Sequence, residues 1–412
     1  MATAAAPLSF RDVLKITGMR RIWIAQSVSV FGDFVAIFAI FSIISFRLHG
    51  SASAVSGVLI AYLLPFTFVS PVAGVFVDRW NVKRTMIGSD LIRAVLVVFL
   101  VFSANIWQIY IILFVLSTVS SFFMPAQSVA IRTIVPREGL MSANALVQQV
   151  FYGLQIVSPA IAAALVALAG PAVCFWLDSA SFVVSAFMIS RVTVHREPAA
   201  ALQNLRSVVH EMNAGAKFIL THSSISVVVL SITAGMFAIR CFGALIAVFV
   251  RDVLAGGNGL FGVLNSLIGV GMITGAQLVH RFGRTRSKAH LVIGGLLGMG
   301  MGIGIVASVT IVPAAVVGML VMGFCAAFLI VPSQALMQEE TPPQMLGRVG
   351  GSMVSVMMAS SVAALALAGP IAQGIGIRNL YFASAVFLVL IAVTGHYKLE
   401  KNITAQRETA NA

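Results

Sequence analysis

The sequence predicts an all-α integral membrane protein with twelve transmembrane helices in two six-helix bundles. Of its 412 residues, 59% are hydrophobic and 9% are charged, and the mean hydropathy of +1.01 lies far above that of soluble globular domains. Twelve apolar segments have about the 20 residues that a helix needs to cross a bilayer core of about 30 Å. A long polar stretch divides them six and six.

Helices are the expected structure of these segments, because the segments are longer than membrane strands and lack their alternation of polar and apolar residues. The expected spans are 22–46, 55–77, 85–104, 106–130, 143–168, 172–189, 225–250, 259–279, 291–311, 313–336, 349–373 and 379–396.

The loop charges predict the orientation of the chain, because cytoplasmic loops retain Lys and Arg. Both termini and alternate loops hold nearly all the cations, and the opposite side has only Arg47, Arg251 and Arg378. We therefore expect a multi-pass protein of the cell membrane with both termini cytoplasmic and membrane lipid around it. The net charge of +13 is explained by topology, and we expect no nucleic-acid partner.

The polar stretch from Val192 to Ser224 marks the predicted domain boundary. The expected domains are an N-terminal six-helix bundle, a cytoplasmic linker and a C-terminal six-helix bundle with a cytoplasmic tail, at 1–192, 193–224 and 225–412.

The linker itself contains a helical pattern. Val208, Met212, Ala216 and Ile219 recur at helical spacing, which favours an amphipathic helix on the cytoplasmic surface. A solvated linker is the alternative.

The two halves also repeat. Pro125 and Pro136 recur as Pro332 and Pro343 at the same separation, each pair closing one span and opening the loop after it. A repeat of six plus six spans is typical of a transporter built from two pseudosymmetric bundles.

The stretch Gly74 to Arg84 (GVFVDRWNVKR) sets three cations and one acid between two apolar spans. It resembles the hallmark of the major facilitator superfamily between spans two and three, G-x-x-x-D-R-x-x-x-[RK]-[RK]. The stretches Asp90 to Ala94 (DLIRA), Phe122 to Pro136 (FFMPAQSVAIRTIVP) and Ser142 to Leu146 (SANAL) are similar to its drug and siderophore exporter group, which includes the macrolide efflux proteins. The resemblance implies a monomeric transporter of a small-molecule substrate, without a cofactor.

The sequence departs from the exporter pattern at two places. The antiporter motif of span five would have glycines around Pro159, where this chain has Ser158, Ala162 and Ala163. No arginine lies within span four, where many proton antiporters of the superfamily carry one.

We expect the Gly74 to Arg84 loop to be half of a cytoplasmic latch. Gly74 would let span two approach a neighbouring helix, and Asp78 would lie against the positive N-terminus of span eleven, a contact of about 0.3–1 kcal/mol. Arg79 would pair with Asp90, with Arg93 on the same face. Lys83 and Arg84 are expected to be topological anchors, and contact with anionic lipid is the alternative for the loop cations.

Two charges lie deep in the expected spans, where an ionisable side chain is a functional candidate by default. Asp33 is about 16 Å from the inner face of span one, and Arg240 has a similar depth in span seven. We expect them to couple protons or substrate, and a mutual structural salt bridge is the alternative. Asp178, near the outer end of span six, is expected to be a hydrogen-bonding group at a helix interface.

Polar, aromatic and methionine side chains within the spans are candidates for a substrate cavity. For each of them ordinary helix packing is the alternative. The set is Gln26, Phe34, Gln148, Tyr152, Gln155, Asn265 and Met357.

Glycine and cysteine patterns indicate packing rather than chemistry. The glycine runs around Gly271 and Gly302 lie inside expected spans, which favours close helix contacts over a nucleotide fingerprint. Cys174, Cys241 and Cys325 lie singly in apolar segments, so neither a metal site nor a disulfide framework is expected.

The predicted function is secondary active efflux of hydrophobic or amphipathic small molecules of the drug or macrolide type, driven by proton antiport through alternating access. The sequence has no Walker A motif, so ATP is not the expected energy source. A siderophore or lysophospholipid transporter is the alternative. An integral membrane enzyme or receptor is disfavoured, because no HExxH motif or nucleophile elbow lies in the spans.

Overall fold

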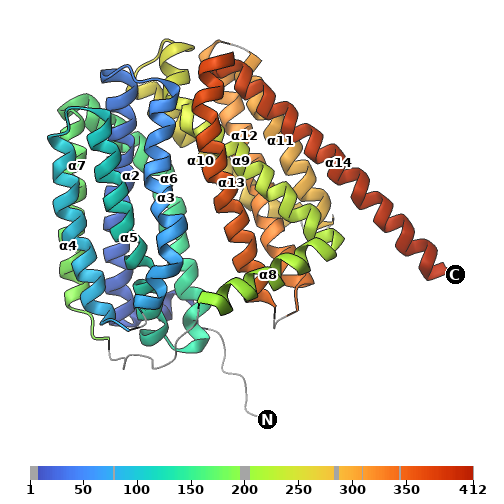
Figure 1. Cartoon of the computed structure of the whole chain (residues 1–412), viewed down its shortest axis with the longest axis horizontal. Helices are drawn as coiled ribbons and strands as arrows, with labels where there is room; N and C mark the ends of the chain where they lie inside the picture. The colour runs from blue at the N-terminus through green and yellow to red at the C-terminus, as the bar shows by residue number, and fades with distance from the viewer. Residues whose placement is uncertain are drawn as a thin grey trace. The chain divides into compact units, whose positions relative to one another are not determined.

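The computed structural model describes residues 8–77, 79–194, 205–282, 287–308, 310–342 and 345–411, and these form the helices of Figure 1. In the N-terminal half they are α1 Phe10–Lys15, α2 Thr17–Ser42 with the π-helical turn η1 Ile43–Arg47, α3 Ala52–Val77, α4 Val82–Val101, α5 Ile106–Ile134, the 3-10 turn η2 Arg137–Gly139, α6 Leu140–Ala169 and α7 Pro171–Ser190. In the C-terminal half they are α8 Leu205–Thr221, α9 Ser223–Asp252, α10 Asn258–Phe282, α11 Lys288–Ser308, α12 Val312–Glu340, α13 Leu346–Ile375 and α14 Ile377–Asn411.

Each of the twelve expected spans is a helix. Among the described residues, eleven helices are long and apolar enough to cross a membrane. The remaining expected span is α4, which carries Lys83, Arg84, Asp90 and Arg93 within 20 residues. Because α4 carries these charges, the residues packed around it must compensate them if it spans the membrane.

The chain forms two compact units. The first contains Met1–His49 and Val58–Leu202, and the second contains Gly50–Gly57 and Gln203–Ala412. In the first unit α7 packs against α2 and α4, and α2 also packs against α6. In the second, α11 and α10 pack against α12, and α9 packs against α13.

Matching helices of the two halves have matching irregularities. Helices α5 and α12 each have 29 residues and an internal proline, Pro125 or Pro332. Helices α6 and α13 each have 30 residues and end at a glycine with positive φ, 81° at Gly170 and 87° at Gly376. That left-handed conformation is open to glycine and strained for other residues. The two halves therefore repeat the glycine that ends these helices as well as the internal proline.

Helix α8 confirms that the polar linker contains a helix. Its Ile219 is buried in a cluster with Val349 and Met353 of α13. A Cβ added at Gly215 would overlap the carbonyl oxygen of Arg348, so the two helices meet closely there. The side chains of Val208 and Met212 lie outside the described residues.

The glycine runs mark helix contacts, as predicted. A Cβ at Gly271 would overlap the Leu320 carbonyl on α12, and one at Gly302 would lie 2.8 Å from the Met322 nitrogen.

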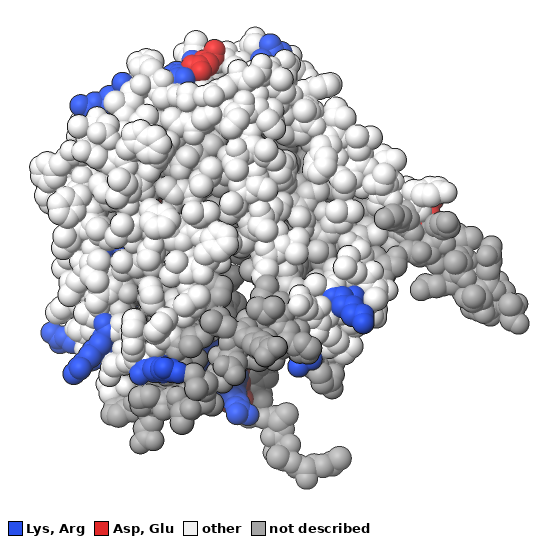
Figure 2. All heavy atoms as spheres, in the orientation of Figure 1, with Lys and Arg blue, Asp and Glu red and all other residues white. Residues whose placement is uncertain are grey.

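In Figure 2 nearly all coloured side chains lie near the ends of the helices, with a broad uncharged belt between them. Large apolar side chains such as Phe99, Trp107 and Leu390 are exposed, as expected for helices that face lipid.

Candidate functional site

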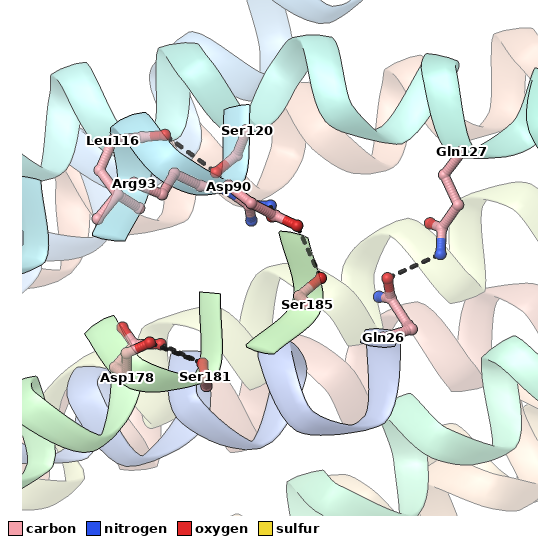
Figure 3. A network of polar contacts seen from close by, with 9 residues as sticks. All are labelled: Gln26, Asp90, Arg93, Leu116, Ser120, Gln127, Asp178, Ser181 and Ser185. Carbon is pink, nitrogen blue, oxygen red and sulfur yellow. Dashed lines mark hydrogen bonds and ion pairs between the residues drawn. The ribbon is translucent and has the colours of Figure 1, made fainter. Parts of the chain in front are cut away.

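A buried ion pair lies at the centre of the first unit. Arg93 binds Asp90 three residues earlier on α4, and their side chains are 5% and 0% exposed. The second Asp90 oxygen accepts a hydrogen bond of 2.7 Å from the Ser185 hydroxyl of α7 (Figure 3). Both carboxylate oxygens of Asp90 are therefore bound, which offsets the cost of placing the charge in the interior.

Two aromatic rings complete the surroundings of Arg93. Its guanidinium carbon lies 4.5 Å from the centroid of Phe123 and 4.3 Å from that of Phe182. Rings at this distance stabilise a cation through their quadrupole. The Arg93 Nε has no hydrogen-bond partner among the described residues, so the charge is balanced by the carboxylate and the rings.

Asp178 lies at the contact between α2 and α7 and is 2% exposed. Its Oδ1 is 3.3 Å from the Ser181 hydroxyl, which also donates to the Asp178 carbonyl at 2.7 Å. A Cβ added at Gly32 of α2 would overlap Asp178 Oδ1 and Ser181 Oγ. Gly32 therefore allows α2 to pass directly over this carboxylate, and Asp33 is the next residue along α2.

These side chains form one charged group, the Arg93 cluster, which consists of Asp33, Asp90, Arg93 and Asp178. The charge of Arg93 attracts each of the three acids, and Asp33 repels both Asp90 and Asp178. Sequence reasoning placed Asp33 and Arg93 in separate roles. Helix α7, which packs against both α2 and α4, brings them together.

A second polar contact joins α2 to α5. The Gln127 side chain, which is 6% exposed, donates a hydrogen bond of 2.7 Å to the Gln26 side chain (Figure 3). Gln26 was a predicted cavity residue and Gln127 was not. The sequence signal that could have identified Gln127 is its position in the Phe122 to Pro136 stretch, which is similar to the exporter group.

An aromatic patch brings together two other predicted residues. The ring of Phe34 is 5.3 Å from that of Phe151, which is 5.9 Å from that of Tyr152. Phe151 and Tyr152 are exposed on α6, as are Gln148 and Gln155. Sequence reasoning missed Phe151, which links α2 to this exposed face.

The predicted residues of the second unit come from three different helices. Arg240 of α9 and Asn265 of α10 are partly buried. Met357 of α13 packs against the hydrophobic cluster that includes Ile219, so its observed contacts are those of a packing residue.

The loop of the Gly74 to Arg84 stretch is anchored by Trp80. Its ring stacks on Phe122 of α5 at 5.7 Å. Asn81 then caps α4 by accepting a hydrogen bond of 3.0 Å from the Arg84 nitrogen. Arg79 and Arg84 are exposed, Lys83 is partly exposed, and Asp78 lies outside the described residues.

One expectation about the predicted latch is wrong. Asp90 does not pair with Arg79, because it points into the first unit, where Arg93 and Ser185 bind both of its oxygens, while Arg79 lies in the exposed turn. Within the described residues a Cβ added at Gly74 would meet no atom within 4 Å, and the close approach of span two to a neighbouring helix stays a prediction.

Two curated relatives are named as efflux proteins. The chain is 26% identical over 382 residues to macrolide efflux protein A of Streptococcus pyogenes, covering 90% of this chain and 93% of the relative. It is 25% identical over 358 residues to the multidrug efflux pump Tap of Mycolicibacterium fortuitum, covering 84% and 87%.

Solved transporter structures share the fold. A mutant of the nucleoside transporter NupG matches with a TM-score of 0.74 at 12% identity, covering 93% of this chain and 99% of the other. A bacterial homologue of the human lysosomal transporter Spinster, solved in an inward-facing conformation, matches with a TM-score of 0.72 at 12% identity, covering 92% and 96%. These matches confirm the predicted fold class.

The family model described as Major Facilitator Superfamily matches residues 22–365. The matched range begins in α2, includes the Arg93 cluster and ends in α13. The chain is therefore a multi-pass membrane transporter that belongs to the Major Facilitator Superfamily.

Proposed function

We propose that this transporter is a secondary active exporter that exchanges protons for hydrophobic or amphipathic small molecules of the drug or macrolide type, by alternating access. The names of the two efflux relatives support the direction and the cargo class. The observation that carries the proposal is Asp33, an acid within α2 whose neighbour in the chain, Phe34, belongs to the aromatic patch on α2 and α6.

An acid in this position suits competition between a proton and a cargo. Phe34, which follows Asp33, contacts Phe151, and the exposed rings of Phe151 and Tyr152 offer an apolar surface with a π-face. Aromatic surface of this kind binds bulky apolar or cationic molecules. The carboxylate of Asp33 adds the negative charge that either a proton or a cationic cargo would neutralise.

The proposal includes the setting of the transporter. It is a monomer of the cell membrane, surrounded by lipid, with both termini in the cytoplasm, as the distribution of Lys and Arg supports. The loop from Asp78 to Arg84 is proposed to act at the cytoplasmic side as part of a latch. Arg79 is exposed there and is available to a partner other than Asp90.

Arg240 favours a second candidate cargo. It is a partly buried cation in the middle of α9, where an anionic group on a siderophore or lysophospholipid would find its charge complement. Such a cargo would depend on Arg240 and not on Asp33.

Proteoliposomes with an imposed pH gradient test the proposal. The wild-type protein is expected to move a macrolide or a cationic dye against the proton gradient, and Asp33→Asn to abolish this movement. Arg240→Ala would instead impair an anionic probe. Asp12→Asn, at an exposed acid outside the spans, is the matched control. Gradient-driven efflux that survives Asp33→Asn would contradict the mechanism.

A further inference from the structure

Three arginines lie on the side of the protein where topology does not require cations. The sequence places only Arg47, Arg251 and Arg378 there, whereas the charges that orient a membrane protein lie on its cytoplasmic side. All three line cavities. Arg47 lines one of about 380 Å³, and Arg251 and Arg378 line another of about 970 Å³. A property that the two cavities share would therefore account for cations that orientation does not explain.

Matching parts of the two halves form these cavities. The smaller cavity belongs to the first unit and is lined by the ends of η1 and α4 and the start of α7. The larger one belongs to the second unit and is lined by the ends of α9 and α11 and the start of α14. Each contains an arginine at the end of the first of these elements, Arg47 or Arg251, and a glycine with positive φ before the last, Gly170 or Gly376. The cavity is thus part of the internal repeat.

The chain also turns in the same way after each of these arginines. Among the described residues, only His49 and Ala255 have positive φ without being glycine, at 47° and 49°. His49 follows shortly after Arg47, and Ala255 shortly after Arg251. Such a conformation costs about 1–3 kcal/mol for a residue with a side chain. Both halves therefore keep a strained turn beside the cavity.

In the larger cavity the two arginines have different partners. Arg251 is paired with Asp252, with Nε 2.5 Å from Oδ1 and Nη2 2.9 Å from Oδ2. Arg378 instead donates to the carbonyl oxygens of Ala307 at 2.9 Å and Ser308 at 3.0 Å, at the end of α11. These carbonyls fix the position of the guanidinium, but they carry no full charge to neutralise it. Arg378 is therefore a positioned cation that an anion in this cavity could pair with.

In the smaller cavity Arg47 is the only charged lining residue. It is exposed, and it makes no hydrogen bond or ion pair with any other described residue. The lining beside it is largely apolar and includes Ile43, Leu100 and Phe175. A cation next to an apolar wall suits a molecule that has an anionic group and a hydrocarbon chain.

A phospholipid has both of these parts. Its phosphate lies just outside the hydrocarbon core, at the level where transmembrane helices end. A guanidinium can bind two phosphate oxygens through parallel N–H groups. The starts of α7 and α14, which line the two cavities, add the positive end of a helix.

We propose that each half binds the phosphate group of a membrane phospholipid at the helix ends that face away from the cytoplasm, on Arg47 in the first unit and on Arg378 in the second. The acyl chains cover the apolar residues beside each arginine. These lipid sites are separate from the proposed cargo site and do not depend on proton coupling.

Native mass spectrometry of the delipidated full-length protein in detergent, with added phosphatidylglycerol, tests the proposal. Arg47→Gln and Arg378→Gln are each expected to weaken lipid binding about fivefold, the effect of losing one arginine near an anionic lipid. The double variant is expected to bind more weakly than either. Arg132→Gln, at an exposed arginine in the last turn of α5, is the matched control outside both cavities. Equal binding by the wild type, both single variants and the double variant would overturn the proposal.

Two further probes identify what the arginines bind. Diacylglycerol has the acyl chains without the phosphate, and it is expected to bind at least about fivefold more weakly than phosphatidylglycerol. Equal binding would reveal apolar grooves with no anion site, contrary to the proposal. Inorganic phosphate at the concentration of the lipid is expected not to displace it. If inorganic phosphate does displace the lipid, and Arg47→Gln prevents this, the sites take free phosphate and the lipid assignment is wrong.

Arg47 decides the test if Arg378→Gln does not fold, since Arg378 also caps α11. Replacing Arg47 removes no contact with a described residue, so loss of folding is not expected. Arg47→Lys keeps the positive charge and is expected to bind phosphatidylglycerol more tightly than Arg47→Gln does. If the two variants bind the lipid equally, the charge of Arg47 does not contact the phosphate and the proposal fails.

Discussion

Arg93 lies three residues after Asp90 on α4, and the two side chains form an ion pair inside the first unit, where they are 5% and 0% exposed. The pair explains how α4 carries charge within an expected span. Each charge alone would be costly in the interior, and the pair is tolerated because Ser185, Phe123 and Phe182 surround it. A buried pair of this kind is most sensitive to losing one partner.

Asp90→Ala is expected to destabilise the protein by about 3–5 kcal/mol, because it leaves the Arg93 guanidinium buried without its carboxylate. Ser185→Ala removes one hydrogen bond and is expected to cost about 1 kcal/mol. Thermal unfolding in detergent would measure both. Equal effects of the two variants would show that the ion pair is not the important contact.

Gly32→Ala is expected to cost about 1–3 kcal/mol, because its Cβ would push α2 away from Asp178 and Ser181. Gly88→Ala on α4 is the matched control, since a Cβ there meets no atom within 4 Å. Alanine is preferred to glycine in a helix by about 0.5–1 kcal/mol, so the control is expected to be neutral or stabilising. Equal losses at both positions would contradict the close contact of α2 and α7.

The fold was predictable because hydropathy and loop charge depend on residues that are local in sequence. Even α4 was found by its length between two loops. The spacing of Asp90 and Arg93 was visible too, yet Asp90 was assigned to Arg79, because sequence does not show which face of α4 points inward. The relation of Asp33 to Asp178 depends on how α2 and α7 pack, and no local pattern of either helix contains it.

The hydrogen bond between Gln26 and Gln127 offers a double-mutant test of the contact between α2 and α5. Gln127→Leu leaves the Gln26 amide oxygen without its donor, and we expect a loss of about 1–3 kcal/mol. Adding Gln26→Leu removes the unpaired group, so the double variant is expected to be more stable than Gln127→Leu alone. Strictly additive losses in thermal unfolding would show that the two side chains do not interact.

The pH dependence of transport is expected to come from the Arg93 cluster and not from the N-terminal helix. Hydrogen bonds from Lys15 and Ser9 hold the pKa of Asp12 below its ordinary value of 3.8. Because that pKa is lowered in the folded protein, the contribution of Asp12 to stability is present at neutral pH and is lost as the pH falls below about 4. Asp12→Asn should therefore leave the transport profile between about pH 6 and 8 unchanged. Asp33→Asn should flatten that profile. If Asp12→Asn flattened the profile as much, the pH-sensitive group would lie outside the cluster.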